Sequence, residues 1–216
     1  MCNVSAERGP HLQGLADDLF EVPMADHQEV VRPHHRFKNV VRCGKPWDLS
    51  HLDPFAFRVD PGLGFEVTVV VLFSSHCFTR SVSRDGRPKS SIPVDELFDD
   101  GRELRVLCER RYELSKRHLP ALVRELRQRS IQIARDNPQN FVSIKRPEGC
   151  DDGEGRQHYV MFFEVVRDTK RKGRLLMQIQ SAYSVDASSQ ERFRLRRRIA
   201  FLNLLKLTSL RRRISG

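Results

Sequence analysis

The stretch HYVMFFEVV (158–166), RDTKRKG (167–173) and RLLMQIQSAYSV (174–185) is the part of the chain that indicates the fold most clearly. Two apolar runs joined by a short, charged loop that closes on glycine predict a β-hairpin. The first run is apolar at nearly every position, which is typical of a strand covered on both faces. We therefore expect residues 157–185 to form an inner ribbon of a sheet, with the other elements packed around it.

Length and composition allow one substantial core. The chain has 216 residues, of which 39% are hydrophobic, and it contains no apolar run of the length that a membrane-spanning helix needs. The N-terminus lacks the basic start and apolar stretch of a secretory signal. The five cysteines are scattered without a C-x-x-C pair, so we expect neither a disulfide framework nor a zinc ribbon. This cysteine usage predicts a cytoplasmic location.

The excess positive charge is concentrated at the C-terminal end. The formal net charge is +10, and residues 191–216 carry eight arginines and one lysine against one glutamate. This segment therefore supplies +8, and residues 1–190 supply only +2. The charge predicts a polyanionic or acidic partner for the tail, and does not by itself predict one for the remaining chain.

Changes in composition predict three parts. Residues 1–36 are polar and read as a weakly structured arm with a short helix near Leu15–Phe20. Their adjacent His34 and His35 are more typical of solvated side chains than of half a metal site. Residues 37–187 read as a single α+β domain, and residues 188–216 as a basic helical tail.

Residues 37–64 are rich in proline and glycine, and we expect an irregular segment that covers one edge or end of the sheet. Within it, Asp48, Ser50 and His51 stand close together in the sequence. Members of a catalytic triad normally come from separated segments. Local hydrogen bonding in a turn is the better interpretation of Asp48 and Ser50.

Residues 65–78 predict another buried strand, because β-branched and aromatic residues dominate it. The strand ends in Ser74, Ser75, His76 and Cys77, a polar end that could border a site. Strand alternation points His76 and Cys77 to opposite faces. The alternatives for His76 are a hydrogen-bonded histidine at a strand end and a catalytic residue.

After a loop at 81–93, apolar residues at roughly helical spacing predict a helix near 95–117 and a second near 120–136, divided at Pro120. Residues 140–146 alternate and read as a strand. The fold class that follows is α+β, with an antiparallel-rich sheet packed against a helical hairpin and a basic amphipathic C-terminal helix.

Glu164 lies in the apolar run of the central hairpin. An unpaired carboxylate inside a sheet is energetically costly. We therefore expect either an ion pair, with Arg80, Lys145 or Arg146 as partner, or a pocket in which Glu164 is a titrating acid.

The tail mixes apolar residues with arginine clusters, of which the largest are Arg196, Arg197 and Arg198, and Arg211, Arg212 and Arg213. A basic amphipathic helix of this kind can bind nucleic acid, an anionic membrane surface or a groove in a partner protein, or it can dock on the sheet. We expect RNA or DNA as the partner.

The predicted order is a strand, two helices and then three antiparallel strands. This order resembles the RelE/ParE toxin superfamily over about residues 65–185, with Tyr159–Val165 and Leu175–Ile179 as the closing strands. The resemblance implies a cytoplasmic ribonuclease and an inhibitor protein as a further partner. It implies an RNA-cleaving set drawn from the following residues: Lys145, Arg146, Arg167, Tyr183, and Glu164 or His158 as base. His76 at its strand end is a further catalytic candidate.

Three kinds of function remain open from the sequence. The first is a metal-independent ribonuclease of toxin type, without a cofactor, in which a base takes the 2′-hydroxyl proton and cations stabilise the phosphate. The second is a non-catalytic module that binds nucleic acid or protein through its tail. Peripheral attachment to a membrane is a third alternative.

Overall fold

A computed structural model describes residues 20–22, 37, 39–133, 140–145, 157–186 and 198–211 of the chain. Several predicted features lie outside these residues: most of the N-terminal arm with His34 and His35, the acidic loop before β11, and the arginines at 146, 196, 197, 212 and 213.

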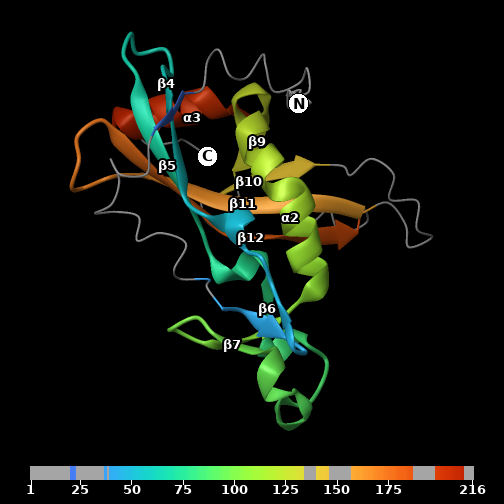
Figure 1. The fold of residues 1–216 in the computed structure, drawn as a ribbon. Helices are drawn as coiled ribbons and strands as arrows, with labels where there is room; N and C mark the ends of the chain where they lie inside the picture. Colours follow the sequence, from blue (N-terminus) through green and yellow to red (C-terminus); the bar gives the residue numbers. More distant parts are fainter. Residues whose placement is uncertain are drawn as a thin grey trace, which may run out of the picture.

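The main body is an eight-stranded sheet with the order β1-β4-β5-β12-β11-β10-β9-β13 (Figure 1). Neighbouring strands are antiparallel except for β5 and β12, which are parallel. The strands of this sheet are β1 (Phe20–Val22), β4 (Phe55–Val59), β5 (Val67–Phe73), β9 (Ser130–Ile133), β10 (Asn140–Lys145), β11 (Gln157–Arg167), β12 (Arg174–Asp186) and β13 (Arg198–Ala200). The antiparallel-rich α+β class is confirmed.

The central hairpin is confirmed as well, since β11 and β12 pair with each other and each has another strand on its far side. Its turn is closed by Gly173 at φ 78°, a conformation that suits glycine. Asp168 and Arg174 form a buried ion pair across that turn, each with a side chain only 3% exposed. A register shift between Phe162 and Phe163 marks a bulge in the pairing.

The two faces of the hairpin differ. Tyr159, Met161 and Phe163 point into the main core, where Phe163 meets Phe201 edge-on at 6.3 Å between ring centroids. On the other face Val166 is 41% exposed, and a small second cluster forms around Val70. One face of the sheet is therefore covered by helices, and the other is partly open to solvent.

Helix α2 (Glu109–Arg124) runs across the core face (Figure 1). It continues through Pro120. The predicted division at Pro120 is therefore wrong. A proline inside a helix costs about 3 kcal/mol, but Leu119, Leu122 and Val123 beside it are buried, and their burial offsets that cost. The helix passes into the 3-10 turn η8 (Glu125–Gln128), and Ser130–Ile133 form β9, where the prediction had helix.

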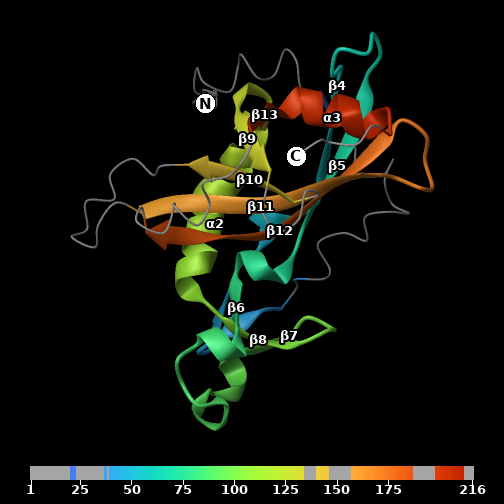
Figure 2. The same ribbon diagram turned by 180° about the vertical axis from the view of Figure 1, so that it is seen from behind.

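Residues 95–108 also differ from the prediction. They contain η7 (Val94–Glu96), β7 (Leu97–Asp99) and β8 (Leu104–Leu107), and β8 lies between β7 and β6 (Thr79–Ser81) in a separate three-stranded sheet (Figure 2). The β7–β8 turn forms because the Asp100 carboxylate accepts the N–H groups of Arg102 and Glu103, and Gly101 adopts φ 81°. Aspartate and glycine favour such turns.

The segment before β5 takes part in the sheet through β4, whereas the prediction had an irregular cover. Ahead of it lie the short pair β2 (Val41–Arg42) and β3 (Lys45–Pro46) and the 3-10 turn η3 (Ser50–Leu52). Phe20, the end of the predicted arm helix, begins strand β1. The predicted strand 65–78 stops at Phe73 and is followed by the 3-10 turn η4 (Ser75–Cys77). The loop at 81–93 contains η5 (Val82–Arg84) and η6 (Lys89–Ser91).

The C-terminal helix α3 (Phe201–Ser209) buries Phe201, Leu204 and Leu205 in the main core. Its docking on the sheet, one of the alternatives for the tail, is confirmed for these residues. Among the described residues, no helix has the length and apolar character that crossing a membrane requires.

Candidate functional site at the edge of strand β12

The candidate site lies where β5, β12, the N-terminal turn of α2 and the small sheet meet (Figure 2). β5 pairs with β12 only as far as Phe73 opposite Ile179. Beyond that point Ser74 holds the strand: its N–H donates to the Ile179 carbonyl at 3.0 Å and its hydroxyl to the Gln180 carbonyl at 2.5 Å. The last residues of β12 therefore present an edge beside η4.

Arg111 of α2 occupies this edge. Its Nη1 donates to the His76 carbonyl at 3.0 Å and to the Thr79 carbonyl at 2.7 Å. The guanidinium carbon lies 4.8 Å from the centre of the Tyr183 ring. Two carbonyls and one aromatic ring thus hold a half-buried cation, and burial lowers the pKa of Arg111 from its ordinary value.

The other side of this guanidinium is open. Nε and Nη2 of Arg111 make no hydrogen bond within the described part of the chain, and no carboxylate there pairs with them. Neither atom is sealed from solvent. Nε–H and Nη2–H form the fork with which arginine binds a phosphate or carboxylate bidentately. Arg111 therefore offers an anion site whose cation is already held in place.

Tyr183 belongs to a short aromatic stack. Its ring lies 5.6 Å from that of Phe162, with 19° between the planes. Both side chains come from the open face of the central hairpin, next to the bulge at Phe162. Arg111, Tyr183 and Phe162 follow one another along this stack, so an anion bound at Arg111 would lie beside an aromatic surface.

The ionisable side chains of His76, Asp100 and Glu103 lie close to one another. His76 Nε2 lies 3.6 Å from Glu103 Oε1 and 3.9 Å from Asp100 Oδ2. Burial, followed by the charge of Arg105, lowers the pKa of His76. Burial alone would raise the pKa of Asp100, but the backbone N–H groups of Glu103 and Arg102 hold it below its usual value.

Cys77 plays no part in this arrangement. The thiol is fully buried, and burial raises its pKa to about 12, so it remains protonated and unreactive at neutral pH. The predicted strand alternation does not apply to His76 and Cys77, because both lie in the 3-10 turn η4.

The structure brings together only some of the predicted site residues. His76 and Tyr183 both contact Arg111. The pairing of His158 with Val185 places this buried histidine on the same face of the hairpin as Tyr183. Arg167 pairs with Leu175 at the opposite end of the hairpin, and Lys145 lies opposite Tyr159.

The surroundings of Glu164 differ from the predicted ones. It pairs in register with Gln178 on the partly open face of the sheet and is only half-buried. It forms no ion pair within the described ranges. The sequence predicted a strand covered on both faces, but the covered face is that of Phe163 and Val165. The Glu164 carboxylate lies on the face that is partly open to solvent, where a charged group has access to water. Arg146 and the side chain of Lys145, two of its expected partners, lie outside the described residues.

The two described arginines of the predicted tail cluster are exposed: Arg198 lies in β13 and Arg211 follows α3. Sequence reasoning missed Arg111, Asp100 and Glu103. The first is one of many arginines on an amphipathic helix, and the carboxylates are far from His76 in the sequence. Only the Asp100–Gly101 turn signal could have indicated the hairpin that carries them.

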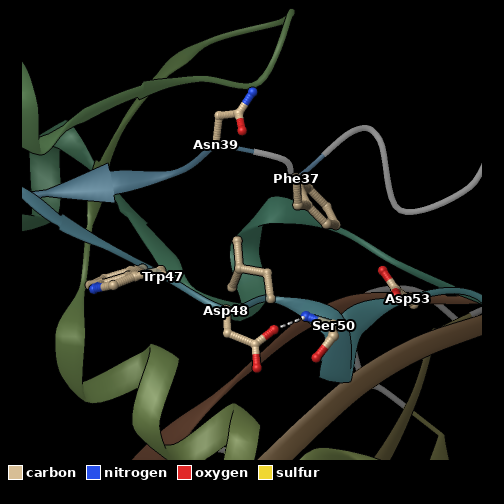
Figure 3. A pocket seen from close by; sticks show the side chains of 7 residues that line it. Phe37, Asn39, Trp47, Asp48, Ser50 and Asp53 are labelled. Carbon is tan, nitrogen blue, oxygen red and sulfur yellow. Dashed lines mark hydrogen bonds between the residues drawn. The ribbon is translucent and has the colours of Figure 1, made fainter.

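A separate hollow of about 260 Å³ lies beside η3 (Figure 3). Its lining includes Phe37, Trp47, Asp48 and Asp53. The Asp48 carboxylate accepts the N–H of Ser50 at 3.0 Å, which confirms the predicted turn. It does not form a triad with His51.

His51 Nε2 lies 2.8 Å from the Ser115 hydroxyl, which itself donates to the Tyr112 carbonyl. Ser115 is fully buried, so substrate cannot reach this hydroxyl as a nucleophile. The His51–Ser115 pair ties η3 to α2.

No curated protein and no solved structure matches this chain. The family model of the YjaZ family matches residues 39–209, which span the small sheet, both described helices and the main sheet apart from β1. The chain therefore belongs to the YjaZ family.

Proposed function

We propose that this protein binds nucleic acid, and that Arg111 anchors a phosphate of the bound strand. The observation that carries the proposal is the open fork of Arg111. Among the residues that the structure describes, no carboxylate pairs with this half-buried guanidinium. Such a guanidinium is suited to an anion, and phosphate matches its bidentate geometry.

The surroundings of Arg111 favour nucleic acid over a small anion. Tyr183 and Phe162 add an aromatic surface next to the fork, and aromatic rings adjacent to cations bind bases and phosphates together. The excess positive charge of residues 191–216, +8 of the total +10, attracts a polyanion over a longer range. Arg198 and Arg211 are exposed elsewhere on the molecule and can contact more of the strand.

The test compares two arginines of the same helix. Arg111→Ala removes the proposed anchor, and Arg117→Ala removes an exposed arginine on another side of α2. Binding of a fluorescent single-stranded RNA is measured by anisotropy between 50 and 200 mM salt, a range in which phosphate contacts weaken strongly.

We expect Arg111→Ala to weaken binding about tenfold and to reduce the slope of log affinity against log salt by roughly 0.7, the value of one phosphate contact on a single strand. Arg117→Ala should change the slope less. Equal effects of the two substitutions, or no binding by the unsubstituted protein, would contradict the proposal.

Cleavage of the bound RNA is the second candidate function. The observation that favours it is the position of Tyr183 beside Arg111, because a cation held at a phosphate stabilises the charge that develops during cleavage. If cleavage occurs, Tyr183→Phe should slow product formation, while Arg111→Ala should reduce both binding and cleavage. RNA that is retained intact under all conditions would exclude the ribonuclease and leave the binding protein.

A further inference from the structure

The turn between β7 and β8 and the 3-10 turn η4 place three potential metal ligands together. His76 comes from η4, whereas Asp100 and Glu103 begin and end the β7–β8 turn. One imidazole nitrogen and two carboxylate oxygens, one from each side chain, lie within 4.8 Å of one another. We propose that His76, Asp100 and Glu103 bind a divalent transition-metal cation, with Zn²⁺ as the best match. The inference does not depend on nucleic-acid binding.

The separations between the ligand atoms suit such a cation. In a tetrahedral zinc site, bonds of about 2.0–2.1 Å put neighbouring ligand atoms roughly 3.3 Å apart. The His76 Nε2 atom already lies 3.6 Å from Glu103 Oε1 and 3.9 Å from Asp100 Oδ2. All three ligand atoms lie within 4.8 Å of one another, and rotations of the His76 and Glu103 side chains, which are 40% and 50% exposed, can close the remaining separations around Asp100.

The two oxygens of Asp100 have separate roles. Oδ1 accepts the N–H groups of Arg102 and Glu103 and thereby fixes the turn. Oδ2 faces His76 and accepts the Ser75 hydroxyl at 3.0 Å. The side chain is only 6% exposed, so one carboxylate is held in a fixed position with an oxygen directed at the imidazole.

The second carboxylate also has a supporting partner. Arg105, which is buried, donates from Nη1 to Glu103 and from Nε to the Thr79 hydroxyl. Metal-binding carboxylates usually carry hydrogen bonds of this kind, which orient them. Oε1 of Glu103, the atom nearest His76 Nε2, is also the atom that accepts Arg105. The second lone pair of Oε1, or the other oxygen of the carboxylate, is left for the cation.

The mixture of nitrogen and oxygen ligands indicates the class of cation. Imidazole with carboxylates suits zinc and its neighbours, whereas calcium and magnesium prefer oxygen ligands alone. Three protein ligands leave a fourth position for water or a ligand, as in open zinc sites. The positive charge of Arg105 next to Glu103 opposes the cation and should limit its affinity.

The test is a titration of the full chain, stripped with a chelator, with ZnCl₂ in a calorimeter, and with Co²⁺ followed by its visible absorption. We expect one cation per chain. His76→Gln and Glu103→Gln should each weaken binding more than about tenfold, the loss that even outer-shell substitutions commonly produce. Glu103 is half-exposed, so its substitution should leave the fold intact.

Glu113→Gln on the exposed side of α2 is the matched control and should bind as tightly as the unsubstituted chain. The chain contains eight histidines, so cation binding alone is not sufficient support. Zinc bound equally by the His76 and Glu103 variants, or no zinc bound at all, would overturn the inference.

Discussion

The main sheet and the small sheet of this protein are stabilised in different ways. The main sheet buries long apolar strands against α2 and α3 in one continuous core. The small sheet has short strands and joins that core mainly through Phe78 and Leu107. Its outer loops are held by an ionic cluster in which Asp85 contacts Arg80 and Arg87, and Arg87 contacts Glu96.

This difference explains which elements could be predicted from sequence patterns. Burial on a strand leaves a period in the sequence, and the central hairpin could be predicted from it. A region held by turns and ion pairs leaves no such period. The apolar residues between 104 and 114 happened to repeat at roughly helical spacing, and the pattern suggested a helix where β8 lies.

The largest expected effect comes from the core of the main sheet. Phe163→Ala should lower the free energy of unfolding by roughly 3–5 kcal/mol, because it leaves a cavity next to Phe201. Urea unfolding followed by circular dichroism measures the change. Val166→Ala, on the open face of the same strand, should have a much smaller effect. Similar losses for both would contradict the assignment of the two faces.

A smaller effect is expected on the pH dependence of stability, which should differ between the contacts of His51 and the ionic cluster of the small sheet. Burial lowers the pKa of His51 from its ordinary value to about 4, so the unfolded chain binds this proton more readily than the folded chain. The contribution of His51 is therefore complete above about pH 6.5, the ordinary histidine value, and is lost as the pH falls toward 4.

Urea midpoints at pH 7.5 and pH 5 test this expectation. The unsubstituted chain should lose more stability at pH 5 than His51→Gln, whose side chain does not titrate. A variant with the same loss would show that His51 is not responsible. The ionic cluster of the small sheet should remain intact at pH 5, because Arg87, and then Arg80, hold the pKa of Asp85 at about 2.

The smallest effect should come from the ionic cluster itself. Asp85→Asn removes the shared carboxylate. The Asp85 side chain is covered, but Arg80 and Arg87 are 34% and 38% exposed, and ion pairs with arginines that reach solvent contribute little. Amide hydrogen exchange in β6 and β8 should accelerate by less than about tenfold, and the global urea midpoint should hardly move. In the unsubstituted chain the same acceleration should appear only as the pH falls from about 4 toward 2, where the depressed pKa of Asp85 is crossed. A large drop in the global midpoint would show that the two sheets unfold as one unit.

The residues of the candidate site also differ in how far local sequence could predict them. His76 was a site candidate because it ends a buried strand, and Tyr183 was one because of the resemblance in element order. Arg111 was not, because on an amphipathic helix its position is equivalent to that of the other arginines. What distinguishes it is its contact with two carbonyls and one ring from other parts of the chain.

The sequence alone determined the α+β class, the central hairpin and the concentration of charge near the C-terminus, because periodicity, turn residues and charge are local properties. Tertiary structure decided that α2 continues through Pro120, that Glu164 faces solvent, and that Asp100 and Glu103 meet His76. Each of these outcomes depends on groups that are distant in sequence, where burial and long-range contacts outweigh local preference.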